Sequence, residues 1–153
     1  MDYFLIVLKW LHLSAAGVAL GGAAFSLLVL IPAAKATLSD DVHDKLREAI
    51  RCRWAKFVHL CIATLFVTGS LQFVLMAIPP KVKAIPYHPI FGVKFLAALG
   101  IFFIASILVG RGEGFAHMRR DRIKWIKIML ALGALIVLLG GVLEHVRTHQ
   151  PLP

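Results

Sequence analysis

Four apolar runs, each long enough to cross the hydrocarbon core of a bilayer, constrain this chain more than any other feature of its sequence. They cover residues 4–32, 55–78, 89–110 and 125–146. A transmembrane helix needs about 20 predominantly apolar residues, so little of the 153-residue chain is left outside these runs. The hydrophobic content of 59% also exceeds the roughly 45–50% of soluble domains. We therefore predict an all-α integral membrane protein, a single domain (1–153) with four transmembrane helices in an antiparallel bundle.

The basic residues are distributed unevenly between the two sides of this predicted bundle. Twelve of the 17 lysines and arginines lie in or beside the first and third connections, and only four lie on the opposite side. This bias follows the positive-inside rule, which places loops 33–53 and 111–124 in the cytoplasm and both termini outside a bacterial inner membrane. The net charge of +9 therefore indicates contact of the loops with anionic membrane lipid rather than binding to nucleic acid.

The first run carries one imidazole, His12, about a third of the way along it. Small side chains follow on the same helical face, namely Ala16, Ala19, Ala23 and Ser26. An ionisable group inside a membrane is costly and is a functional candidate, and a stripe of small residues leaves a hollow in which a flat cofactor or a metal could lie. The alternative is that the small residues only permit close helix packing, as expected for the GxxxG pair Gly17 and Gly21 on another face.

Lys94 occupies a similar position in the third run. It enters from the same predicted side as His12 and precedes a second stripe on its own face, Ala98, Ile101 and Ala105. At a rise of about 1.5 Å per residue, both polar side chains lie roughly 8 Å below the outer boundary. We therefore expect His12 and Lys94 to belong to one site. The alternative is that Lys94 extends back to the outer surface.

The remaining histidines define two possible groupings. His88 and His145 lie at the outer boundary, so either could be the second ligand of a site built on His12. His59 enters from the opposite side and lies about 15 Å from His12 along the membrane normal, in a core of about 30 Å. An inner site would therefore need His59 with His117, and we favour the outer site.

Three local features complete the expectations. The first span is expected to end at Pro32, and a helix capped at Ser39 is expected to run into the second span, with His43 solvated on it. Gln72, inside the second span, is expected to form a hydrogen bond across the bundle rather than face lipid.

The residue types near His12 favour haem over copper. Imidazole binds haem iron and copper alike, so the histidine alone does not discriminate. No methionine-rich cluster or cysteine pair accompanies it, which weakens a copper-transport interpretation. The positive charge of Lys94 would repel a bare cation but could pair with a porphyrin propionate. We therefore predict haem b as the cofactor, with copper as the alternative.

Several short motifs carry a resemblance to known membrane families. They are Trp10-Leu-His-Leu with the Gly21-Gly22 pair, Arg53-Trp-Ala-Lys, Thr68-Gly69 and the segment His88-Pro-Ile-Phe-Gly-Val-Lys94. In these segments the chain resembles the copper-resistance D (CopD) and HemJ-type families of four-helix membrane proteins. The resemblance extends over most of the chain.

The resemblance implies a function for two residues. HemJ-type proteins bind haem b and oxidise protoporphyrinogen with a first-span histidine and a third-span lysine, which correspond to His12 and Lys94. Two departures bear on that activity: Ala105-Ser106 stands where the family has a Tyr-His pair, and Ile31-Pro-Ala-Ala replaces a Pro-Arg end of the first span. The resemblance therefore implies a haem pocket in this chain more directly than it implies the oxidase activity of the family.

Three functional hypotheses follow. The first is a b-type haem redox protein that handles electrons or a porphyrin substrate near the outer leaflet, with His12 as axial ligand and Lys94 as the candidate catalytic residue. The second is a copper-handling transport or resistance protein that uses His88, His145 and His149. The third is a non-catalytic accessory subunit of a homo-oligomer or a larger membrane complex, for which the GxxxG face would suffice.

Overall fold

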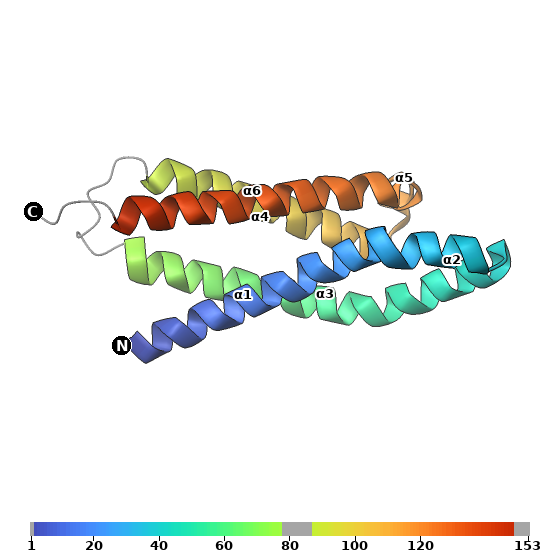
Figure 1. Ribbon diagram of the computed structural model, residues 1–153, viewed down its shortest axis with the longest axis horizontal. Helices are drawn as coiled ribbons and strands as arrows, with labels where there is room; N and C mark the ends of the chain where they lie inside the picture. Colours follow the sequence, from blue (N-terminus) through green and yellow to red (C-terminus); the bar gives the residue numbers. More distant parts are fainter. Residues whose placement is uncertain (1, 78–86, 149–153) are drawn as a thin grey trace, which may run out of the picture.

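The computed structural model describes residues 2–77 and 87–148, and the side chains of 3–75 and 89–142 (Figure 1). The long helices are α1 (Asp2–Phe25), α3 (Asp40–Ala77), α4 (Tyr87–Val109) and α6 (Arg122–Thr148). The short ones are the π-helix η1 (Ser26–Leu30), α2 (Ile31–Thr37), the 3-10 helix η2 (Glu113–Phe115) and α5 (Ala116–Arg120). The described residues contain no strand, and four helical stretches among them are long and apolar enough to cross a membrane. The predicted all-α, four-helix membrane fold is confirmed.

The first span does not end at Pro32 as expected, because α1, η1 and α2 form one continuous helical stretch to Thr37. Proline lacks an N–H, and its ring clashes with the carbonyl four residues earlier in a regular α-helix. That carbonyl belongs to Leu28, inside the π-helical turn, where the Ile31 N–H donates to the carbonyl of Ser26. The wider turn precedes the proline and lets the helix continue past it.

The predicted helix after Ser39 does continue into the second span, as one helix of 38 residues, α3. Such a helix is about 57 Å long at a rise of about 1.5 Å per residue, well beyond a hydrocarbon core of about 30 Å. The charged part of α3, before Trp54, therefore extends beyond the apolar part of the bundle.

The four long helices pack as two antiparallel pairs, α1 on α3 and α4 on α6, joined through contacts of α3 with α4 and of α1 with α6 (Figure 1). We call the end that holds the α2–α3 turn and residues 110–121 the basic end. The opposite end, where α1 begins and α6 finishes, is called the terminal end. A cluster of buried apolar side chains joins the two pairs: Ala23, Ile31, Ile104, Ile126 and Met129.

Large apolar side chains cover the outside of the bundle. Leucines on each of the four long helices are highly exposed: Leu13 (74%), Leu60 (64%), Leu96 (69%) and Leu138 (69%). A soluble monomer rarely presents such a continuous apolar surface, whereas a bilayer solvates it. The surface therefore supports a transmembrane chain.

The GxxxG pair Gly17 and Gly21 does not form a close contact between helices of the bundle. A Cβ added at Gly17 or Gly21 would meet nothing within 4 Å, so this pair faces outward. Gly22 makes the close contact instead, because a Cβ there would overlap the Trp54 ring. The α1–α3 packing thus depends on the second glycine of the Gly21-Gly22 pair.

Candidate functional site

A cavity of about 250 Å³ lies between the helices towards the terminal end, and both His12 and Lys94 line it. We call it the His12 cavity. The stripes of small residues expected to form a hollow contribute to its walls, with Ala16 and Ala19 from α1 and Ala98 from α4. The structure therefore brings together the two residues that depth along the helices had placed in one site.

A hydrogen-bond chain fixes the orientation of the His12 ring. The Thr68 hydroxyl donates to the carbonyl of Thr64 at 2.6 Å, and Thr68 Oγ1 lies 2.8 Å from His12 Nδ1. Since the hydroxyl proton is used for Thr64, the oxygen accepts from His12 Nδ1–H. The proton on Nδ1 leaves the lone pair on Nε2, which is the arrangement of a metal-ligating imidazole held by a neighbouring group.

Gly69 allows the His12 ring to lie directly on α3. A Cβ at this position would come within 3.3 Å of His12 Cε1 and 3.9 Å of Nδ1. The neighbouring Thr68 is almost fully buried, with 4% of its surface exposed. The Thr68-Gly69 pair therefore supplies both a hydrogen-bond partner and the space for the imidazole.

Two lysines line the same cavity. Lys94 is half-buried, and its Nζ lies 3.7 Å from where a Cβ of Gly140 would be, so the side chain points across the bundle to α6. This placement differs from the alternative in which Lys94 extends to the outer surface. Lys9 lies three residues before His12 on the same helical face and is exposed at the edge of the cavity. Lys9 was not among the predicted site residues, although its spacing of three residues from His12 places it on the same helical face.

Gln72 places an unpartnered donor at this cavity. Its Nε2 atom is buried and has no hydrogen-bond partner among the described residues, contrary to the expected hydrogen bond across the bundle. A buried polar group without a partner costs about 1–3 kcal/mol. The amide is therefore available to an acceptor atom on a group bound in the cavity.

Aromatic side chains form much of the apolar wall. The rings of Phe73 and Phe91 stack with centroids 4.2 Å apart, and those of Phe91 and Phe95 follow at 6.3 Å. Phe66 and Phe102 complete the set. Together with the small residues of α1 and α4, these rings suit a flat apolar group.

The other predicted site histidines are placed as follows. The His59 side chain is exposed, lines neither cavity of the bundle described here, and hydrogen-bonds the carbonyl of Ala55 through Nδ1 at 2.7 Å. His117 is exposed on α5, so the structure does not bring these two together. His88 and His145 lie in the first turn of α4 and the last part of α6, at the terminal end, but their side chains fall outside the described residues, as does the whole of His149.

The described donor set of the His12 cavity contains a single imidazole, which is compatible with haem. Within the part of the chain that the structure describes, no three His, Cys, Asp or Glu side chains come together. Haem iron takes four ligands from the porphyrin and needs only one or two from the protein, so a single oriented imidazole is sufficient. The lysines and the Gln72 amide then match the acidic edge of a porphyrin, and the apolar wall matches its ring.

A second cavity, of about 380 Å³, lies at the basic end, and we call it the basic-end cavity. Its titratable lining consists of His43, Arg47, Glu48, Arg51, Arg111, Arg119 and Arg122. His43 is not solvated as expected, because its side chain is only 16% exposed. It shares a helical face with Arg47 and Trp54, which turn towards the cavity.

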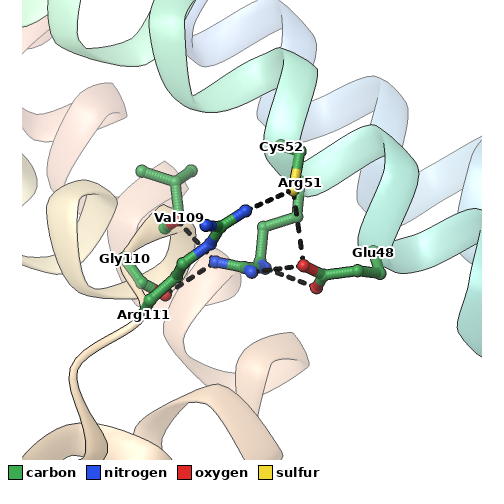
Figure 2. A network of polar contacts seen from close by, with 6 residues as sticks. All are labelled: Glu48, Arg51, Cys52, Val109, Gly110 and Arg111. Atoms are coloured by element: carbon green, nitrogen blue, oxygen red, sulfur yellow. Dashed lines mark hydrogen bonds and ion pairs between the residues drawn. The ribbon is translucent and has the colours of Figure 1, made fainter.

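A polar network holds one wall of this cavity (Figure 2). Arg51 donates through Nη1 to the carbonyls of Val109 (3.0 Å) and Gly110 (2.9 Å), at the end of α4 where carbonyls lack helical partners. The same guanidinium binds both carboxylate oxygens of Glu48. Arg111 donates to the Cys52 sulfur at 3.1 Å. The network thus ties the end of α4 to α3, and the hydrogen bonds from Arg51 lower the pKa of the Glu48 carboxyl to about 2.

No protein-family model, curated protein or solved structure matches this chain. The resemblance to CopD and HemJ-type proteins therefore stays a prediction from the sequence motifs.

Proposed function

We propose that this protein is a membrane-integral b-type haem protein that handles electrons, or a porphyrin substrate, near the terminal end of its helix bundle. The observation that carries the proposal is the His12 imidazole, whose Nδ1–H is hydrogen-bonded to Thr68 so that Nε2 is left to bind iron. The charges of Lys94 and Lys9 at the same cavity provide partners for carboxylates.

Each residue has a definite task in this proposal. When bound, haem b supplies one-electron exchange at its iron. His12 would hold the iron, and Thr68 keeps the ring in the tautomer that leaves Nε2 free to do so. Lys94 orients a carboxylate of the porphyrin or of a porphyrin substrate, and Gln72 donates to one of its oxygens. The phenylalanine wall keeps water from the apolar part of the cavity.

The first experiment is an absorption spectrum of the protein purified in detergent from cells that make haem. We expect a Soret band in the wild type and its loss, or a changed spin state, in His12→Ala. Stoichiometric copper by elemental analysis with no Soret band would replace the proposal with the copper-handling hypothesis. Neither haem nor copper would favour an accessory subunit, for which the outward-facing Gly17 and Gly21 provide a packing surface.

Lys94→Met tests the role of the cavity charge. The substitution keeps most of the side-chain volume and removes a cation from the bundle, so the helical fold should be preserved while haem retention falls several-fold. Lys56→Met, at an exposed position of α3, is the matched control and should retain haem fully. An unchanged spectrum and redox behaviour in Lys94→Met would remove Lys94 from the site. Assay of both variants with protoporphyrinogen separates an oxidase from an electron carrier.

His59→Ala distinguishes the His12 cavity from an inner site. The exposed His59 lines neither cavity, and we expect the variant to keep the wild-type spectrum. If His59→Ala lost haem while His12→Ala kept it, the site would have to be moved to the inner half of the bundle.

The charge distribution supports an orientation with the basic end in the cytoplasm of a bacterium and both termini in the periplasm. A reporter enzyme that works only in the periplasm should be active when it is fused after Pro153, and one that works only in the cytoplasm should be inactive there. Cytoplasmic activity would reverse the orientation and place the His12 cavity near the inner leaflet.

A further inference from the structure

We propose that the basic-end cavity binds one anionic phospholipid, with its phosphate among Arg47, Arg119 and Arg122 and an acyl chain in the apolar part of the cavity. This proposal does not depend on haem binding in the His12 cavity. It concerns a different cavity with a different set of polar groups.

The arginines of the cavity divide into two groups. Five of them line it, from α3, the segment after α4, α5 and α6. Arg51 is fully used by Glu48 and by the end of α4, and Arg111 is hydrogen-bonded to Cys52 (Figure 2). The cavity's one carboxylate, Glu48, is therefore already neutralised by Arg51.

The second group lacks sufficient negative charge. Arg47 has one exposed partner, Asp44, at 3.4 Å. Arg119 and Arg122 are both half-buried, and within the described residues no hydrogen bond or ion pair of their side chains occurs. Arg122 lies close enough to Arg47 to be repelled by its charge and close enough to Asp44 to be attracted by it, so this one exposed carboxylate is shared between two arginines. An anion between these three guanidinium groups would relieve that repulsion and accept bidentate hydrogen bonds.

The remainder of the cavity is apolar, which indicates an amphiphile rather than a small anion. Its apolar walls include Ala23, Val58, Ala105, Leu108, Ile126 and Met129. The volume of about 380 Å³ falls within the roughly 300–1,000 Å³ of ligand sites. The small side chains of Ala23 and Ala105, from the stripes on α1 and α4, create the space for a chain. A phosphate at the arginines and the upper part of one acyl chain beside these alanines would occupy the cavity.

The position in the membrane selects a phospholipid among anionic amphiphiles. The arginines follow or precede the apolar parts of α3, α4 and α6, at the level where headgroups lie. Basic pockets between transmembrane helices at a cytoplasmic face are sites for anionic headgroups, and each basic residue near the surface contributes about 1 kcal/mol. A phospholipid of the adjacent leaflet has both required parts at the correct depth.

Native mass spectrometry of the delipidated full-length protein tests the proposal, with phosphatidylglycerol and phosphatidylcholine of identical acyl chains as probes. We expect one phosphatidylglycerol retained per chain in preference to phosphatidylcholine. At about 1 kcal/mol for each arginine, the double variant Arg119→Gln/Arg122→Gln should weaken this retention roughly 30-fold. The matched control is Arg120→Gln/Lys124→Gln, which removes the same charge from exposed positions outside the cavity and should change retention less than threefold.

Ala105→Leu is the second variant, since it fills the apolar part without altering any charge. It should also reduce phosphatidylglycerol retention, and circular dichroism confirms that each variant is folded. Equal loss in both double variants would mean that only the general surface charge matters, and would overturn the site. Displacement of the lipid by millimolar inorganic phosphate would assign the cavity to a free anion instead. A Soret band that survives His12→Ala but disappears in Arg119→Gln/Arg122→Gln would assign it to a porphyrin.

Discussion

The two cavities of this bundle are built largely from the same helices but carry different sets of polar side chains. The His12 cavity has one imidazole oriented by a hydroxyl, two lysines and an unpartnered amide. The basic-end cavity has five arginines, two of which are occupied by a network that ties α3 to α4. In both, alanines from the same two stripes provide the space. Small residues thus create the space in both cavities, and the polar side chains that line each one determine which kind of ligand fits there.

The largest effect is expected from Gly22→Ala, which should disturb the basic-end cavity. A Cβ at this position would overlap Trp54, a rigid ring that lines that cavity. Overpacking of this kind costs about 1–3 kcal/mol, and we expect a lower thermal unfolding midpoint in detergent. Gly17→Ala is the control: it meets nothing within 4 Å and should stabilise α1 by about 0.5–1 kcal/mol. Equal effects of the two variants would contradict the close contact at Gly22.

Arg51→Gln should have the next largest effect, again at the basic end. It removes the hydrogen bonds to Glu48 and to the carbonyls of Val109 and Gly110. Each of the two bonds from the charged guanidinium to a carbonyl contributes about 1.5–3 kcal/mol net. We expect a loss of about 2 kcal/mol in unfolding free energy and no change at the His12 cavity. Arg53→Gln, at an exposed position two residues later, should be neutral. A Soret band altered by Arg51→Gln would show that the two cavities are coupled.

Thr68→Val should act on the His12 cavity alone. Valine keeps the shape of the side chain and removes the oxygen that accepts from His12 Nδ1–H, so the ring is no longer held in one tautomer. Loss of such a partner costs about tenfold in affinity for the bound metal group, which haem titration of the purified protein would measure. Thr68→Ser retains the hydroxyl and should restore most of the affinity. If Val and Ser behaved alike, the hydrogen bond would have no part in haem binding.

The smallest effect is a pH dependence at the basic end. The pKa of Glu48 is lowered from 4.5 to about 2 in the folded protein, first by its hydrogen bonds to Arg51. A lowered pKa stabilises the folded state above the unfolded-state value, and this stabilisation is lost as the pH falls from about 4.5 to about 2. Thermal unfolding in detergent across this window should therefore show a steeper decline for the wild type than for Glu48→Gln. Parallel curves would contradict the proposed role of the Arg51–Glu48 pair.

Much of the fold could be predicted because the membrane leaves few solutions for an apolar chain. The lengths of the four runs identify the helices, and the charge bias identifies the two ends. The depth of His12 and Lys94 along their helices was sufficient to place both at one cavity. Helical rise and hydrophobic length are local quantities, so a sequence contains them directly.

The rest depends on how helices turn towards one another, which periodicity alone does not determine. Pro32 predicts a helix end, but the π-helical turn before it depends on the packing of the whole span. His43 lies in a charged stretch of the sequence that predicts a solvent-exposed helix. In the folded bundle its side chain turns inward to line the basic-end cavity and is only 16% exposed. Gln72 and the arginines could likewise not be assigned to cavities until the faces of α3 and α6 were known.

The two cavities are separated by a short apolar wall, since both are lined by Ala19, Leu20, Leu65, Ile101 and Phe102. None of these five side chains can stabilise a chain of water molecules, because none offers a hydrogen-bond donor or acceptor. A bundle with polar hollows at both ends would otherwise provide a conduit along its axis. The wall therefore divides the polar lining of the bundle into two separate groups, one towards each end.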